Sequence, residues 1–317
     1  MSTDRGMRLA VLGAGGVGGF LAAALERAGN PVLVVAREAT AELIARQGIE
    51  VSSERLGAFT ARPRATSHLE EPVDVLIVAT KSTGLQAAME RVRAEPQLTV
   101  PLLNGLDHLP LLRERLRGPV AAGAIRIEST RTAPGRIEHT SPFLRVDMAS
   151  VQAPVRASLT RLAQSLEAAG VPARVLESEA QVMWSKLVRL NALACTTSAT
   201  GLTLGAIRSD PSHRATLEAA VAEAAAVARA EGARLEAATV MDELDDAHDT
   251  LNSSMARDIE ADRRPELDAI AGAVLRAGAR HGLACPTIER LAGEVAARAG
   301  VAPPAAIATL QAPDVAP

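Results

Sequence analysis

Six consecutive residues near the start of the chain have the types and spacing needed to bind the phosphates of a dinucleotide. The run is Gly13-Ala14-Gly15-Gly16-Val17-Gly18, between a short apolar run, Leu9–Leu12, and an alanine- and leucine-rich run that reaches Ala28. In such a GxGxxG turn, the first glycine allows a sharp turn, the second lets a pyrophosphate approach the backbone, and the third lets the helix pack closely on the strand. The helix N-terminus then directs N–H groups and its positive dipole end at the phosphates. A turn without a ligand is the alternative.

Arg37 bears on which dinucleotide would bind. A break at Gly29-Asn30-Pro31 and a second apolar run, residues 32–36, precede it and complete a unit of strand, glycine turn, helix and strand. Folds that use NAD usually place Asp or Glu at the end of this second strand, whereas an arginine suits the 2′-phosphate of NADPH. We therefore expect NADPH, the alternative being a surface arginine beside Glu38.

Two more polar residues follow buried-type strands. Lys81 comes after residues 73–79, and Asn104 comes after residues 99–103. Strands and helices alternate through this half of the chain, which predicts a mainly parallel sheet with helices on both faces. Ligands of such sheets bind beyond the carboxyl ends of the strands, where the glycine turn, Arg37 and these two residues all fall.

The remaining pattern predicts two domains. Further strands are expected at 49–52, 58–65, 120–127, 136–139 and 144–147, and helices at 39–47 and 85–92. From about Glu177 helical spacing dominates, with helices expected at 179–194, 211–231, 235–247, 251–261, 265–281 and 288–299. We predict an α/β Rossmann-type dinucleotide-binding domain at 1–177, an all-α C-terminal domain at 178–302 and a loose tail at 303–317.

Composition excludes several classes of protein. The chain has 317 residues, enough for two domains, and its net charge of -3 argues against nucleic-acid or anionic-membrane partners. No apolar run reaches the roughly 20 residues of a membrane span, and residues 1–6 lack a signal-peptide pattern, so we expect a cytoplasmic protein. Cys195 and Cys285 form no metal-binding pattern, which predicts two reduced thiols and no metal.

Together with later motifs, these residues resemble the ketopantoate reductase family. The later motifs are Trp184-Ser185-Lys186-Leu187, Ser253-Ser254-Met255-Ala256-Arg257-Asp258, Pro265-Glu266-Leu267-Asp268 and Gly282-Leu283-Ala284-Cys285-Pro286. With the glycine turn, Lys81 and Asn104-Gly105, they follow the family's order over nearly the whole chain. The resemblance implies an NADP-dependent oxidoreductase acting on CH–OH groups, which reduces a 2-oxo acid to a 2-hydroxy acid. The first candidate is 2-dehydropantoate, reduced to pantoate in pantothenate biosynthesis.

The resemblance also implies a role for each matching residue. Lys186 matches the catalytic lysine that protonates the developing alkoxide, and Glu266 matches the glutamate that orients the lysine or the substrate hydroxyl. Ser254 and Asn104 match substrate- and cofactor-side hydrogen-bonding positions, and Lys81 matches a cofactor-proximal lysine. The implied cofactor-binding set is Gly13, Ala14, Gly15, Gly16, Val17, Gly18, Arg37, Lys81 and Asn104. The alternative for Lys186 is a surface lysine on a helix, and for Glu266 a carboxylate at the start of a helix. For Ser254 it is a serine at a helix N-terminus.

One departure from the family concerns Asn191. The family usually places asparagines four and eight residues after the lysine, on one helix face. Here Leu190 and Ala194 hold those positions, and Asn191 lies about 140° from Lys186 around a regular helix. A one-residue bulge would return Asn191 to the pocket as a substrate-binding residue. A regular helix, which we favour, would leave an apolar wall and imply a changed substrate.

Several points stay open at this level. Arg126 would meet a substrate carboxylate if residues 124–129 lie near the nicotinamide, and is otherwise an exposed strand arginine, whereas His139 is expected to be a structural or strand-surface residue. Competing functions are reduction of a different ketone or imine in specialised metabolism and a non-catalytic NADPH sensor, although a sensor has no use for Lys186 and Glu266. The expected partner is a small-molecule 2-oxo acid, and a homodimer is compatible with the sequence. We expect Lys186 where the helical domain meets the open strand ends.

Overall fold

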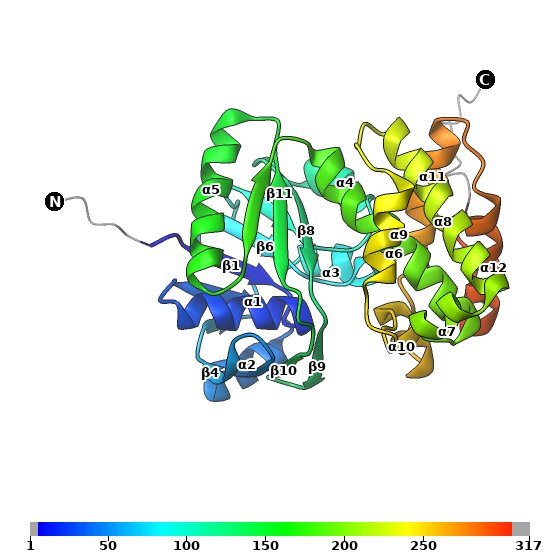
Figure 1. Ribbon diagram of the computed structural model, residues 1–317. Helices are drawn as coiled ribbons and strands as arrows, with labels where there is room; N and C mark the ends of the chain where they lie inside the picture. Colours follow the sequence, from blue (N-terminus) through cyan, green and yellow to red (C-terminus); the bar gives the residue numbers. More distant parts are fainter. Residues whose placement is uncertain (1–5, 306–317) are drawn as a thin grey trace, which may run out of the picture. The chain divides into compact units, whose positions relative to one another are not determined.

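The computed structural model describes residues 6–305 and divides between Met183 and Trp184 into two compact units (Figure 1). All described strands belong to the first unit, and the second is built from helices. The prediction of an α/β Rossmann-type domain followed by an all-α domain is confirmed. The division falls inside helix α6 (Glu179–Thr200), and the boundary at 177/178 stays a prediction. Of the expected tail, 303–305 form no helix or strand and 306–317 lie outside the described residues.

A five-stranded, fully parallel sheet forms the centre of the first unit. Its order is β5 (Arg64–Thr66), β2 (Val32–Val35), β1 (Leu9–Leu12), β6 (Val75–Val78) and β7 (Thr99–Pro101). β1, β2 and β6 are buried along their whole lengths. Continuous apolar runs are typical of parallel strands covered on both faces, which is why the sequence predicted these strands correctly.

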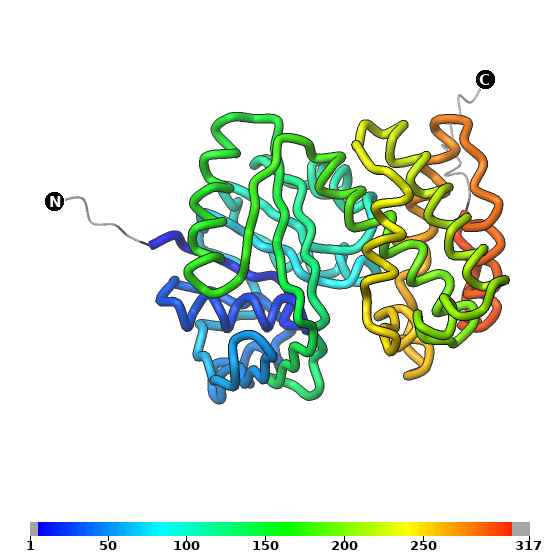
Figure 2. Tube along the Cα trace, viewed as in Figure 1, coloured from blue at the N-terminus to red at the C-terminus, as the bar shows by residue number. Residues whose placement is uncertain are grey.

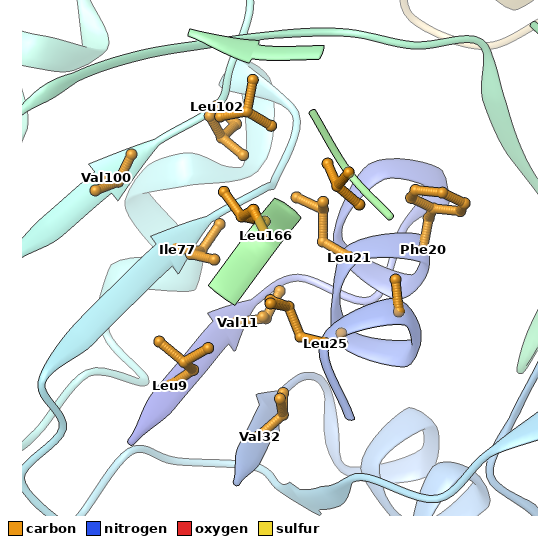
Figure 3. Packing of buried hydrophobic residues seen from close by; sticks show 14 of the residues in the cluster. Leu9, Val11, Phe20, Leu21, Leu25, Val32, Ile77, Val100, Leu102 and Leu166 are labelled. Atoms are coloured by element: carbon orange, nitrogen blue, oxygen red, sulfur yellow. The ribbon is translucent and has the colours of Figure 1, made fainter. Parts of the chain in front are cut away.

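Helices cover both faces of this sheet, and side chains that alternate along β1 contribute to the core on each face. Leu9 and Val11 join a core with α1 (Gly16–Arg27) and α5 (Ala153–Ala168), and Figure 3 shows Phe20, Leu21 and Leu25 of α1 beside them. Ala10 and Leu12 join the opposite core with α3 (Leu85–Met89) and α4 (His108–Arg115). With aromatics at only 1% of the residues, alanine and aliphatic side chains must fill both cores.

Two further sheets differ from the expected arrangement. One has the order β4 (Gly57–Ala61), β3 (Ile49–Ser53), β10 (Arg136–His139) and β9 (Ser129–Ala133), and only its β3–β10 pair is parallel. The other has the order β12 (Ala173–Leu176), β11 (Arg145–Ala149) and β8 (Ala122–Arg126). The strand expected at 58–65 was wrong. It divides at Pro63, which lacks a backbone donor, into β4 and β5 of different sheets.

His139 is a structural residue of the second sheet. It is buried at the end of β10, with its ring 4.8 Å from the ring of Phe20. Its Nδ1 lies 2.8 Å from Ser53 Oγ and its Nε2 lies 3.1 Å from Ser141 Oγ. Burial lowers the pKa of His139, so the neutral ring links strands and has no exposed proton to transfer.

The second unit can be followed from green to red in Figure 2. After α6 it contains α7 (Leu204–Ser209), α8 (Pro211–Ala230), α9 (Ala237–Asp245), α10 (Ser254–Glu260), the π-helical turn η2 (Asp268–Gly272), α11 (Ala273–Arg280) and α12 (Pro286–Ala299). The helix expected at 265–281 therefore starts later and opens with a π turn. Within residues 6–305, no helix combines the length and apolar character needed to cross a membrane.

Candidate active site

The glycine turn lies between β1 and α1, and its glycines meet different needs. Gly13 has φ of 104°, and a Cβ there would lie 2.9 Å from the carbonyl oxygen of Ala79. A Cβ at Gly18 would lie 1.9 Å from the carbonyl oxygen of Gly13, so the helix approaches the strand too closely for any side chain. A Cβ at Gly15 would meet nothing within 4 Å. The fold thus requires Gly13 and Gly18, whereas Gly15 leaves open space.

This turn fits the phosphates of a dinucleotide. Gly15 is the N-cap of α1, and among the described residues no side chain caps this helix and no acidic residue occupies its first turn. Its first N–H groups therefore meet neither a competing carboxylate nor a capping hydroxyl, which suits an anionic ligand. The open space at Gly15 would let a pyrophosphate reach the backbone.

We expect Gly15→Ala to weaken NADPH binding about tenfold or more while leaving the melting temperature unchanged, because the new methyl fills only ligand space. The backbone at Gly15 has φ of -81°, which alanine adopts without strain. Gly18→Ala is the matched control. Its methyl would overlap the Gly13 carbonyl, and overpacking of this kind costs roughly 1–3 kcal/mol of stability. Thermal melts and NADPH titrations of both variants check this, and wild-type affinity in Gly15→Ala would contradict it.

The other expected cofactor-binding residues follow the ends of neighbouring strands. Leu12 is paired in register with Val35 and Val78, and Val78 with Pro101, so four parallel strands end side by side. The residues that follow these ends are Arg37, exposed at the start of α2 (Glu38–Gln47), Lys81, exposed before the short helix η1 (Ser82–Gly84), and the half-buried Asn104. The first unit therefore brings the glycine turn, Arg37, Lys81 and Asn104 to one edge of its sheet.

Sequence reasoning missed two residues beside the turn. The carbonyl oxygen of Ser129 would lie 2.2 Å from a Cβ at Gly16, and Ser129 Oγ donates a hydrogen bond to the Gly16 carbonyl at 3.0 Å. The buried hydroxyl of Thr80, which follows β6, has no hydrogen-bond partner among the described residues, and its methyl would lie 3.0 Å from a Cβ at Gly13. Since unsatisfied buried hydroxyls are rare, Thr80 is a further group that could bind a dinucleotide.

Arg126 reaches the same edge of the sheet. It is half-buried at the end of β8, and Val120, just before β8, pairs in parallel with Thr99 of β7. β8 therefore runs in the direction of the parallel strands, and Figure 1 shows it alongside them. The Ser129 contact with Gly16 brings the residues after Arg126 to the glycine turn.

The expected catalytic residues belong to the second unit. Lys186 is half-buried on α6, which is α-helical from Glu179 to Thr200, so the regular register applies to Leu190 and Ala194. Ser254 is exposed at the start of α10. The capping role belongs instead to Ser253, whose Oγ accepts a hydrogen bond from Ala256 N at 3.0 Å.

Two hydrogen bonds join α6 to the segments that carry Ser254 and Glu266. Thr197 Oγ1 donates to Ser253 Oγ at 2.9 Å, beside Ser254. Asn191 Nδ2 donates at 3.3 Å to the carbonyl of Ile270, in the π turn that follows Glu266. Glu266 is 9% exposed and Asn191 is 0% exposed. α6 is thus the scaffold that links the polar residues of this unit, and Asn191 stays a predicted substrate contact, with its amide turned to the backbone of η2.

The two cysteines are free, as expected, and both are buried. Burial raises the pKa of the Cys195 thiol to about 12 and that of Cys285 to about 11. Only a thiolate is a good nucleophile, so neither thiol suits nucleophilic chemistry near neutral pH.

Comparison with known proteins identifies similar sequences over both units. The family model described as ketopantoate reductase PanE/ApbA matches residues 9–151, and the model of its C-terminal domain matches residues 180–299. The 2-dehydropantoate 2-reductase of Caulobacter vibrioides is 31% identical over 295 residues, which cover 88% of this chain and 94% of that protein. YkpB of Bacillus subtilis, described as an uncharacterized oxidoreductase, is 30% identical over 295 residues and 89% of this chain, 96% of its own length.

Solved structures share the fold of this chain. A PanE/ApbA family ketopantoate reductase from Ralstonia eutropha JMP134 superposes with a TM-score of 0.81 at 26% identity, covering 93% of this chain and 99% of that one. A D-mandelate dehydrogenase, solved with NADH and anilino(oxo)acetate, shares the fold with a TM-score of 0.84 at 21% identity, over 93% of this chain and 98% of its own.

Proposed function

This chain belongs to the ketopantoate reductase family, and we propose that it reduces the keto group of a 2-oxo acid with NADPH. The family consists of oxidoreductases that act on CH–OH groups and use a nicotinamide dinucleotide. The observation that carries the proposal is the alignment of four parallel strand ends beside the glycine turn, Arg37, Lys81 and Asn104. 2-Dehydropantoate is the first candidate substrate, since a relative 31% identical to this chain bears that name.

The first unit supplies groups for each part of NADPH. The glycine turn would hold the pyrophosphate and Arg37 the 2′-phosphate. Lys81 and Asn104 follow β6 and β7, on the other side of β1 from Arg37, and would serve the nicotinamide half. When bound, NADPH supplies a hydride to the substrate carbonyl carbon.

Lys186 is proposed as the proton donor. An ammonium gives a proton to the carbonyl oxygen as it becomes an alkoxide, and its charge offsets the negative charge that develops there. Glu266, largely buried, would orient the ammonium or the substrate hydroxyl, and the exposed Ser254 hydroxyl would hydrogen-bond the substrate.

The use of lysine in this chain supports both lysine assignments. Lysine and arginine together number 34 in the sequence, yet Lys81 and Lys186 are the only lysines. All the other residues in this combined count are therefore arginines. A guanidinium stays protonated at all ordinary pH values and is a poor proton donor, whereas an ammonium can release its proton. Lysine at these two positions alone is the pattern that a catalytic role and a cofactor-binding role would produce.

We assign Arg126 to the substrate carboxylate, because its strand ends at the cofactor edge. Arg126→Gln is expected to raise KM for a 2-oxo acid about tenfold, since it removes a charge-assisted hydrogen bond, with NADPH affinity unchanged. Arg131→Gln, on the exposed part of β9, is the matched control. The effect should vanish with the methyl ester of the same 2-oxo acid. An equal loss with the ester would show that Arg126 does not bind the carboxylate.

Two residues of α6 favour a substrate other than 2-dehydropantoate. Leu190 and Ala194 hold the positions where the family usually has asparagines, so the pocket wall beside Lys186 is proposed to be apolar. This change favours a 2-oxo acid with an apolar group, and a protein of the same fold, a D-mandelate dehydrogenase, was solved with anilino(oxo)acetate. Imines are the second alternative substrate class.

Loss of NADPH absorbance with a substrate panel tests the proposal. The panel contains 2-dehydropantoate, aliphatic and aryl 2-oxo acids, and a cyclic imine. Turnover of any 2-oxo acid supports the proposed function, and the best one names the side chain. Turnover of the imine alone would support an imine reductase. NADPH binding without turnover of any compound would support a non-catalytic NADPH sensor.

A further inference from the structure

The chain that follows Glu266 opens with a π turn in place of a regular helix. Residues 268–272 are π-helical, and Ala273 N donates to the carbonyl of Asp268, five residues back. Inside the turn, Ile270 N still donates to the carbonyl of Glu266, only four residues back, at 3.0 Å. Isolated π turns are rare and amount to one extra residue inserted in an α-helix.

The π turn determines the direction in which Glu266 faces. The helix α11 follows the turn, and its buried face fixes its rotation in the core. On this face Ala273 is 1% exposed, and Val274 and Ala277 are both 0% exposed. With α11 fixed in this way, one extra residue rotates everything before it by about 100° around the helix axis. A regular helix would therefore turn the Glu266 carboxylate away from its present direction.

Asn191 holds the middle of this turn from a neighbouring helix, whereas the carbonyl of Asp268, at its start, also accepts from Arg276 Nη2 of α11 at 3.1 Å. Asn191 belongs to the neighbouring helix α6, is fully buried, and donates from Nδ2 to the carbonyl of Ile270 in the middle of the turn. Loss of a buried hydrogen bond of this kind weakens the segment that it holds. The same helix carries Lys186, so one rigid element holds both the proposed proton donor and the turn that orients Glu266.

We propose that Asn191 is a positioning residue, which fixes the π turn and thereby the direction of Glu266 relative to Lys186. The proposal rests on the proposed function, because it takes Glu266 as a catalytic group. It also accounts for an asparagine displaced by one residue from the family's position, since this amide serves the helix backbone at Ile270. In this role Asn191 acts through the backbone at Ile270 and needs no contact with the substrate.

Asn191→Leu tests this, because it keeps the size of the side chain and removes the donor. We expect kcat for the best 2-oxo acid to fall about tenfold, KM to change little, and the pH profile of kcat to shift. NADPH affinity should stay as in wild type. Ser198→Ala is the matched control, since Ser198 is also buried on α6 and its hydroxyl has no partner among the described residues. Asn191→Asp, which has the same shape without the donor, repeats the test if the leucine variant does not fold.

Deletion of Ala269 provides an independent arm, because it should turn the π segment into a regular α-helix and rotate Glu266. In this background Asn191→Leu should cause no further loss of kcat, since the two changes act on one element. Faster amide hydrogen exchange at residues 270–273 in Asn191→Leu is expected even if no substrate is found, which separates this inference from the proposed function. Wild-type kcat and pH profile in a folded Asn191→Leu, or additive losses in the double variant, would overturn it.

Discussion

Lys186→Ala should lower turnover of the best 2-oxo acid by about 10²–10⁴-fold, because general acid catalysis contributes a factor of that size. NADPH affinity should change little, since the residues proposed to hold the cofactor belong to the first unit. Stopped-flow measurement of NADPH oxidation in single turnovers checks the chemical step directly, and an NADPH titration checks binding.

Lys186→Arg separates proton donation from charge. If Lys186 acts only by its positive charge, arginine should restore most of the activity. If Lys186 donates a proton, arginine should not restore the activity, because a guanidinium does not release its proton near neutral pH. The substitution keeps the positive charge at this position, so it isolates the ability to release a proton. Normal turnover in Lys186→Ala would refute the mechanism.

Arg37→Asp should weaken NADPH binding by about ten- to a hundredfold, with NADH much less affected. A charge-assisted hydrogen bond to the 2′-phosphate is worth roughly 1.5–3 kcal/mol, and the aspartate adds repulsion. Arg37 is exposed where β2 meets α2, so the substitution should not disturb the core. Arg46→Asp, the same charge change in the last turn of α2, is the control for a general electrostatic effect. Equal losses for both cofactors would show that Arg37 does not contact the phosphate.

Much of the first unit could be predicted from local signals. Apolar runs such as Leu9–Leu12 identified the parallel strands, and the glycine spacing identified the turn after β1. Pro63 was also a usable signal, because proline breaks a strand, and it marks the division between β4 and β5. The number of lysines was a further signal for Lys186.

Contacts between distant segments could not be predicted in this way. The approach of Ser129 to Gly16 joins residues 113 positions apart, and nothing in either segment encodes it. The direction in which Glu266 faces depends on a π turn in a run whose apolar spacing reads as an ordinary helix. Asn191 shows the same limit, because its partner is a backbone carbonyl of another helix, and inspection of α6 alone suggested only a substrate contact or an apolar wall.

The most direct test of the central claim is the transfer of deuterium to a 2-oxo acid from NADPH that carries deuterium at both C4 positions, read by mass spectrometry of the product. Wild-type protein should place one deuterium on C2 of the 2-hydroxy acid, with 2-dehydropantoate tried first. Lys186→Ala should form this product about 10²–10⁴-fold more slowly. Failure of the wild-type protein, with NADPH bound, to label any 2-oxo acid of the panel would contradict the proposed reductase function.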